Sequence, residues 1–173
     1  MVTFELSKCK RITIVGVSGS GKSTLAQRLG DMLNLPVCHL DCLFWQPNWV
    51  KTDKEVFLNQ VKEITEKDKW IIDGLYQATI LYRFSRADII IFLNYPKDFC
   101  IESIKASRQR NEKRVGTPDF CDEQDDEIDY ESWGEFSEKY PEIMLLLEKF
   151  SSKVLEFQSR KELENYLLTM MPK

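Results

Sequence analysis

The sequence lacks the features that mark membrane, secreted and disordered proteins. Its longest apolar runs, residues 89–93 and 143–147, are far shorter than the roughly 20 residues that cross a bilayer. Residues 1–11 contain no apolar segment typical of a signal peptide. Seven glycines and six prolines in 173 positions are too few for a collagen-like or flexible chain. We therefore expect one cytoplasmic domain spanning residues 1–173, with no membrane segment.

Cysteine and positive charge are also limited. Five cysteines, an odd number at irregular spacing, do not form a disulfide framework, and we expect reduced thiols. The 24 Lys and Arg residues are outnumbered by 28 Asp and Glu residues, giving a net charge of −4. Because proteins that bind DNA non-specifically are normally basic, we do not expect direct DNA binding.

Histidine occurs once, at position 39. His39 lies within a short predicted strand, where we expect it to point into the fold without a functional role. Its neighbours Cys38, Asp41 and Cys42 resemble a metal cluster. However, alternation along the strand places Cys38 and His39 on opposite faces, so we do not expect zinc binding.

Short apolar runs alternate with helical patterns along the chain. The predicted strands are 11–16, 37–40, 70–73, 88–94 and 153–157, and the predicted helices are 22–34, one that starts at about 52, 97–114, 133–150 and 161–170. This alternation predicts an α/β fold, with a parallel sheet covered by helices on both faces. The irregular segments 42–51 and 115–132 are long enough to be binding loops or lids.

The first predicted strand leads into the clearest motif of the chain. Residues 16–23, Gly-Val-Ser-Gly-Ser-Gly-Lys-Ser, match G-x-x-x-x-G-K-[ST] between a strand and a helix, which predicts a P-loop. Its backbone N–H groups and the helix N-terminus would hold phosphate oxygens. Lys22 would bridge the β- and γ-phosphates, and the Ser23 hydroxyl would bind Mg²⁺.

Two carboxylates, Asp41 and Asp73, end predicted strands at the carboxyl edge of the sheet. Asp73 would bind Mg²⁺ directly or through water, although an Asp before Gly74 also starts turns. Asp41 would orient or deprotonate a hydroxyl acceptor, or contact Mg²⁺ through water, or close an Asx-turn.

The segment 41–67 is the expected acceptor side of the site. Trp45 and Trp49 would wall a pocket for a planar or sugar-like substrate, or would cover the core under a long loop. Arg83 would clamp an acceptor phosphate, or would be a solvated surface residue.

A basic stretch at 105–114 precedes an acidic one at 119–131. The basic residues would close over the transferring phosphoryl group, bind nucleic-acid phosphates, or form a solvated helix face. Because the stretch immediately precedes Gly116-Thr-Pro118, we favour a lid, over about residues 108–132, that carries arginines.

The motifs at 16–23, 40–45, 70–76 and 87–93 together resemble the adenylate-kinase-related P-loop proteins known as DNA topology modulation proteins. The resemblance implies a three-layer P-loop NTPase of the nucleoside-monophosphate-kinase type, with a five-stranded parallel sheet of order 2-3-1-4-5. It further implies Mg²⁺ at Asp73 and lid arginines among Arg108, Arg110 and Arg114. The implied ATP site comprises Gly16, Ser18, Gly19, Ser20, Gly21, Lys22, Ser23 and Thr24.

Together these observations predict a phosphotransferase that uses ATP and Mg²⁺. Its acceptor would be a nucleoside monophosphate or a hydroxylated metabolite, held near Asp41, Trp45 and Arg83, with Asp41 as base for a hydroxyl. Two alternatives stay open: a nucleotide-binding regulator of DNA topology, and an ATPase whose acceptor is water. The sequence does not indicate an oligomeric state.

Overall fold

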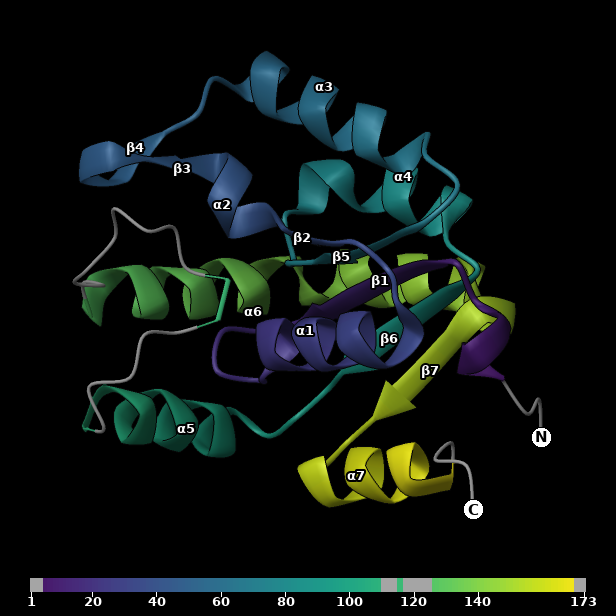
Figure 1. The fold of residues 1–173 in the computed structure, drawn as a ribbon. Coiled ribbons are helices and arrows are strands. Elements are labelled where there is room, and N and C mark those ends of the chain that lie inside the picture. The colour runs from purple at the N-terminus through teal and green to yellow at the C-terminus, as the bar shows by residue number, and fades with distance from the viewer. Residues whose placement is uncertain (1–4, 110–114, 117–125, 170–173) are drawn as a thin grey trace.

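Five parallel strands form the central sheet. In spatial order they are β2 (Val37–His39), β5 (Trp70–Asp73), β1 (Arg11–Gly16), β6 (Ile89–Leu93) and β7 (Val154–Phe157) (Figure 1). Along the chain this is the order 2-3-1-4-5, so the predicted fold is confirmed. All residues of β5 and β6 are buried, as expected for β-branched strands that are covered on both faces.

The computed structural model describes residues 5–109, 115–116 and 126–169, and none of the helices in these ranges is long and apolar enough to cross a membrane. Its helices are α1 (Lys22–Leu33), α2 (Leu40–Phe44), α3 (Lys54–Thr65), α4 (Gln77–Arg86), α5 (Lys97–Gln109), α6 (Asp126–Lys149) and α7 (Arg160–Thr169). Single 3₁₀ turns occupy Leu6–Lys8, Pro47–Trp49 and Ser151–Lys153, and a small antiparallel pair joins β3 (Trp45–Gln46) to β4 (Val50–Lys51).

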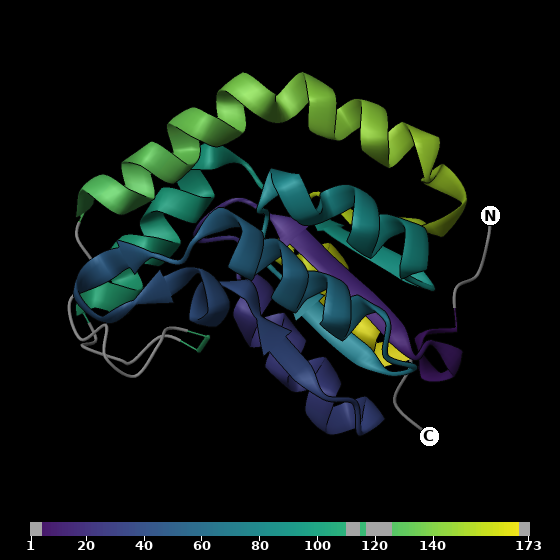
Figure 2. The same cartoon turned by 90° about the horizontal axis from the view of Figure 1, so that it is seen from above.

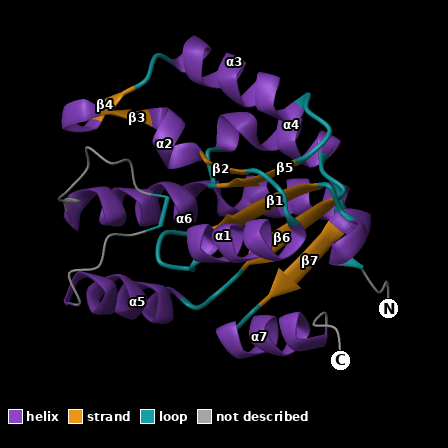
Figure 3. Ribbon diagram, viewed as in Figure 1, coloured by secondary structure: helices purple, strands orange, loops and turns teal. Residues whose placement is uncertain are grey.

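The helices cover the two faces of the sheet in separate layers. Helices α1 and α7 pack on one face together with the start of α5, and α3, α4 and α6 pack on the other. Figure 2 shows α6 curving along the side of the sheet opposite α1, and Figure 3 shows the strands enclosed between helices. The carboxyl ends of β1, β2 and β5 consequently open at one edge.

The segment 42–51 differs from the prediction of irregular structure. Its first residues belong to α2, and the remainder forms the β3–β4 pair around a 3₁₀ turn. The following helix is capped by Asp53, whose Oδ1 accepts hydrogen bonds from the N–H groups of Glu55 and Val56. The neighbouring Thr52 hydroxyl donates to the Leu43 carbonyl.

Candidate active site at the P-loop

The P-loop closes tightly against α5. Gly19 has φ +82°, and a Cβ at this position would lie 2.3 Å from the Cys100 carbonyl oxygen and 2.9 Å from Ile104 Cγ1. Only glycine fits this approach without displacing backbone. The loop therefore takes its shape from α5 as well as from β1 and α1, which it connects.

Residues 18–24 of the P-loop and of the first turn of α1 line a cavity of about 510 Å³. Lys22 lies at the start of α1, and its Nζ donates a hydrogen bond of 3.0 Å to the Val17 carbonyl. The Ser20 hydroxyl is buried and has no hydrogen-bond partner among the described residues. An amide-lined loop with an ammonium group and a spare hydroxyl fits phosphate oxygens.

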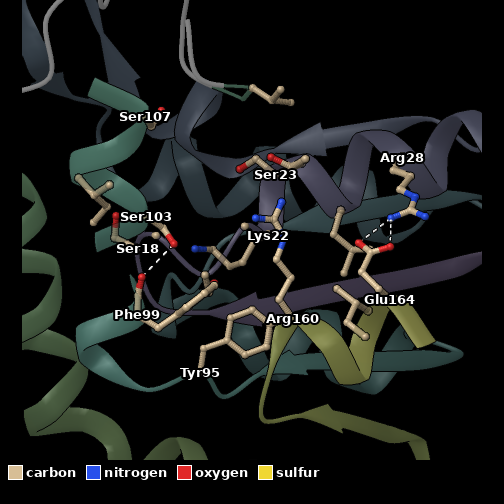
Figure 4. Close-up of a pocket in the computed structure, with 18 of the residues that line it drawn as sticks. Ser18, Lys22, Ser23, Arg28, Tyr95, Phe99, Ser103, Ser107, Arg160 and Glu164 are labelled. Atoms are coloured by element: carbon tan, nitrogen blue, oxygen red, sulfur yellow. Dashed lines mark hydrogen bonds and ion pairs between the residues drawn. The ribbon is translucent and has the colours of Figure 1, made fainter. Parts of the chain in front are cut away.

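The opposite wall of this cavity comes from the segments that follow β6 and β7. Tyr95 and Phe99 follow β6, and Arg160 begins α7. Figure 4 shows Lys22 and Arg160 extending into the same hollow, beside an ion pair in which Arg28 contacts both oxygens of Glu164 at 2.8 Å. These wall residues were not predicted from the sequence, although Tyr95 and Arg160 closely follow predicted strands, at the ligand-binding edge of a parallel sheet.

Ser23, Asp73 and His39 form a chain of short hydrogen bonds that begins at the cavity, which Ser23 lines. The Ser23 hydroxyl donates to Asp73 Oδ2 at 2.6 Å, and His39 Nδ1 lies 2.6 Å from Asp73 Oδ1. A carboxylate only accepts, so Nδ1 carries the proton. Asp73 ends β5 with 3% of its side chain exposed, and His39 ends the neighbouring strand β2.

His39, for which the sequence predicted no functional role, contacts a candidate site residue through this bond. In the parallel register His39 pairs with Asp73, so the ends of two adjacent strands bring them together. Burial lowers the pKa of His39, but the hydrogen bond and charge of Asp73, together with the charge of Asp41, raise it on balance above its usual value.

Asp41 also lines the cavity. It lies in the first turn of α2 rather than at the end of a strand. Asp41 is exposed to solvent. Nearby protein atoms nevertheless displace part of the water around its carboxylate, and this partial desolvation raises the pKa of Asp41. A hydrogen bond of 2.6 Å from the Tyr76 hydroxyl and the charge of Lys22 act in the opposite direction. A carboxylate with a raised pKa at a cavity wall is suited to accept a proton.

The oxygens of Ser23 and Asp73 fit Mg²⁺. This ion takes one or two protein oxygens and completes its shell with water and substrate phosphates. Among the described residues, no group of three or more His, Cys, Asp and Glu side chains could hold a metal ion.

Trp45 and Trp49 belong to an aromatic cluster made up of Phe44, Trp45, Trp49, Phe57 and Tyr76. The two tryptophan rings are 5.5 Å apart at 79°, and Phe44 lies 4.7 Å from Tyr76. Neither tryptophan is among the described residues that line the cavity. The cluster reaches the site through Tyr76, whose hydroxyl contacts Asp41.

The expected role of Arg83 as a clamp on an acceptor phosphate is not compatible with its position. The residue is fully buried in α4. Its guanidinium donates to the carbonyls of Gly74 at 2.8 Å and Leu75 at 3.1 Å, and to the hydroxyls of Thr13 and Thr79. These bonds hold the turn after β5, so Arg83 supports the site from beneath.

The arginines expected in a lid fall mainly beyond what the structure describes. Arg108 lies in α5, but its side chain is not described, and Arg110 and Arg114 lie outside the described residues. Val115 and Gly116 are described. Val115 lines the cavity, and the Gly116 carbonyl accepts a hydrogen bond of 3.3 Å from Cys42 Sγ.

The sheet order and the P-loop define the class of the molecule: it has a P-loop kinase-like fold. A family model described as an AAA domain, AAA_18, matches residues 12–133, and the chain belongs to this family. None of the curated protein sequences matches it significantly.

Solved structures of small-molecule kinases share this fold. Shikimate kinase from Acinetobacter baumannii, determined with shikimate, has a TM-score of 0.58 and 14% identity over 95% of this chain and 93% of that chain. Shikimate kinase from Bacteroides thetaiotaomicron has a TM-score of 0.56 and 18% identity, covering 94% and 96% of the two chains. A gluconokinase from Sinorhizobium meliloti 1021 has a TM-score of 0.56 and 11% identity, covering 93% and 91%. At these identities the likeness shows the fold alone.

Proposed function

We propose that this protein is a cytoplasmic kinase that transfers the γ-phosphoryl group of ATP to a hydroxyl group of a small metabolite. The observation that carries the proposal is the shared cavity: Lys22 and Ser23 line it from α1, and Asp41 lines it from α2. A phosphate-binding lysine and a carboxylate facing one space are the two parts that hydroxyl phosphorylation needs.

The donor side of the reaction is assigned to the P-loop. Its backbone N–H groups and Lys22 would bind the β- and γ-phosphates and offset the charge that develops on them. Bound Mg²⁺ would neutralise phosphate charge, held by Ser23 and by Asp73. Lys22 would exchange its present contact with the Val17 carbonyl for phosphate oxygens.

The acceptor side is assigned to Asp41. Its carboxylate would take the proton from the acceptor hydroxyl, whose oxygen forms a bond to the γ-phosphorus as the bond to the leaving ADP oxygen breaks. Tyr76 would hold this carboxylate in place through its 2.6 Å hydrogen bond. The aromatic cluster, which includes Trp45, would border the acceptor through Tyr76.

A hydroxylated metabolite is favoured over a nucleoside monophosphate. Arg83 commits its guanidinium to the protein interior, so it does not supply a phosphate clamp. The structural relatives named above are kinases whose names state hydroxylated acceptors, shikimate and gluconate. On the basis of its four sequence motifs, we also propose that the chain belongs, within the AAA_18 family, to the DNA topology modulation proteins.

The test is an acceptor screen followed by phosphorus NMR. Protein is mixed with MgATP and sugars, polyols, hydroxy acids or nucleoside monophosphates, and the ³¹P signals of ATP, ADP and any new phosphate ester are recorded. The proposal expects one acceptor class to form an ester with wild type, and at least about a hundredfold less with Lys22→Ala or Asp41→Asn. ATP loss without any ester would indicate an ATPase, and no loss beyond that of Lys22→Ala would contradict the kinase assignment.

A further inference from the structure

We infer that His39 is a positioning residue for the Mg²⁺–nucleotide site: it fixes the carboxylate of Asp73 so that Asp73 and Ser23 act together on the bound ion. The inference rests on the proposed function, because it assumes that the cavity takes a nucleotide with Mg²⁺. It assigns a role to the one histidine of the chain.

Both oxygens of Asp73 are occupied by one donor each. Oδ1 accepts from His39 Nδ1 and Oδ2 from the Ser23 hydroxyl, both at 2.6 Å. With 3% of its side chain exposed, Asp73 depends on protein donors rather than bulk water for hydrogen bonds. A carboxylate held at one oxygen has a fixed plane, so the bond from His39 also sets the direction of Oδ2.

Fixing Oδ2 determines how the Ser23 hydroxyl is oriented. A hydroxyl that donates its proton to a carboxylate keeps its lone pairs available for a cation. Without His39, the Asp73 carboxylate would be free to turn about its last side-chain bond, and the Ser23 proton would lose a fixed acceptor. Groups that hydrogen-bond to metal-binding residues in this way are worth 10- to 100-fold in metal affinity.

The ring of His39 is itself held by its surroundings. The strand register places His39 opposite Asp73, and the backbone of Gly116 lies against the ring. A Cβ at Gly116 would approach His39 Cγ and Nδ1 to 2.8 Å. His39 therefore contacts two segments that are distant in sequence, the end of β5 and Gly116, and Asp73 connects it to Ser23.

The experiment compares nucleotide binding with and without Mg²⁺. Calorimetric titrations with ATP are run in MgCl₂ and in EDTA, for wild type, His39→Leu and His39→Asn. Leucine removes the donor, whereas the asparagine amide nitrogen reaches the place of the imidazole Nδ1. In wild type, Mg²⁺ should increase the affinity for ATP, and in His39→Leu this increase should be at least about tenfold smaller. The affinity for ATP in EDTA should stay within about twofold of wild type, because Lys22 and the loop amides are unchanged.

The other variants distinguish a positioning role of His39 from a general loss of structure. His39→Asn should recover most of the gain, and Cys38→Ala, a change on the same strand, should behave as wild type. Thermal unfolding checks that each variant folds. If His39→Leu does not fold, His39→Gln, whose donor lies farther along the side chain, should show the same loss.

The other possible results contradict the inference, and each of them has a different explanation. An unchanged Mg²⁺-dependent gain in His39→Leu would leave the kinase proposal intact but remove the role of His39. Equal losses of affinity in MgCl₂ and in EDTA would show a structural role instead. If wild type binds no ATP in either buffer, the proposed function fails, and the role of His39 fails with it.

Discussion

The Tyr76 hydroxyl donates a hydrogen bond of 2.6 Å to Asp41 Oδ1, and so connects the aromatic cluster to the cavity wall. Tyr76 precedes α4 and Asp41 lies in α2, so the bond joins two elements on the acceptor side. Burial raises the pKa of the Tyr76 hydroxyl, and the charge of Asp41 raises it further. The hydroxyl therefore keeps its proton and acts only as a donor to the carboxylate at neutral pH.

Tyr76→Phe should impair Asp41 as a base. The hydrogen bond from Tyr76 favours the ionised carboxylate, so its loss raises the pKa of Asp41 further. Asp41 must be ionised to accept a proton, and the acidic limb of the kcat profile should move to higher pH. We expect kcat to fall roughly tenfold because the base is less well positioned. The measurement is a kcat–pH profile with the acceptor found in the screen.

The control is Tyr82→Phe, a change at an exposed tyrosine of α4. It removes the same hydroxyl group from a tyrosine within the helix that Tyr76 precedes, at a position on the outer surface, and it should leave the profile unchanged. A Tyr76→Phe enzyme with the wild-type limb and the wild-type kcat would show that the hydrogen bond does not support catalysis.

Gly116→Ala should disturb the site with little effect on stability. Gly116 has φ +79°, and an added Cβ would lie 2.8 Å from the His39 ring and 3.1 Å from Ser23 Cβ. Either the ring or the backbone must move, and we expect kcat/KM to fall about tenfold or more. The strained φ should cost only about 1–2 kcal/mol of unfolding free energy. Steady-state kinetics and urea unfolding measure the two effects.

Gly134→Ala is the matched control. Gly134 is exposed within α6, and an added Cβ would have no heavy atom within 4 Å. Alanine there should stabilise the helix by up to about 1 kcal/mol with unchanged kinetics. Wild-type activity in Gly116→Ala would mean that the contact of Gly116 with His39 has no influence on the reaction.

The sequence was sufficient for the sheet and the phosphate-binding loop because both depend on local patterns. Each strand of the sheet is a short apolar run between helical segments, and the P-loop is a contiguous motif. The strand order came from the resemblance carried by several motifs, and the structure confirms it.

Residues of the site that depend on packing between distant segments were not predictable in this way. His39 meets Asp73 only because β2 and β5 pair in parallel register. Alternation along a single strand indicates which face a side chain occupies, but not that a histidine at the end of a strand meets a carboxylate on the next. Arg83 has the charge of a surface residue, and only the packing of α4 on the sheet shows that its acceptors are buried carbonyls.

The carboxylate of Asp88 should make the free energy of unfolding decrease at acid pH. Its Oδ2 accepts from the N–H groups of Lys10 and Arg11, both at 2.9 Å, and its Oδ1 from the Arg11 guanidinium at 2.7 Å. Partial burial raises the pKa of Asp88, but these hydrogen bonds and the charge of Arg11 lower it on balance. A lowered folded-state pKa gives stability that is present above the unfolded-state pKa and lost as pH falls through the folded-state value.

Asp88→Asn should therefore be less stable than wild type at pH 7, by about 1 kcal/mol. The difference should shrink as pH falls through the folded-state pKa, because protonated Asp88 loses the same charge. Urea unfolding at a series of pH values measures it. Asp68→Asn, at an exposed position before β5, is the control and should show no such trend. A constant difference at all pH values would contradict the role of the Asp88 charge.

Arg83→Met should destabilise the fold strongly. It removes the donors to the Gly74 and Leu75 carbonyls and leaves buried polar groups without partners, which should cost about 3 kcal/mol or more of unfolding free energy. Arg86→Met is the matched control: Arg86 lies in the last turn of the same helix, is exposed, and donates to the Thr65 and Glu66 carbonyls. Its loss should cost about 1 kcal/mol. Urea unfolding and the KM for the acceptor together distinguish a structural role of Arg83 from a role in binding an acceptor phosphate. Wild-type stability with a raised KM in Arg83→Met would contradict the structural role and support the phosphate clamp.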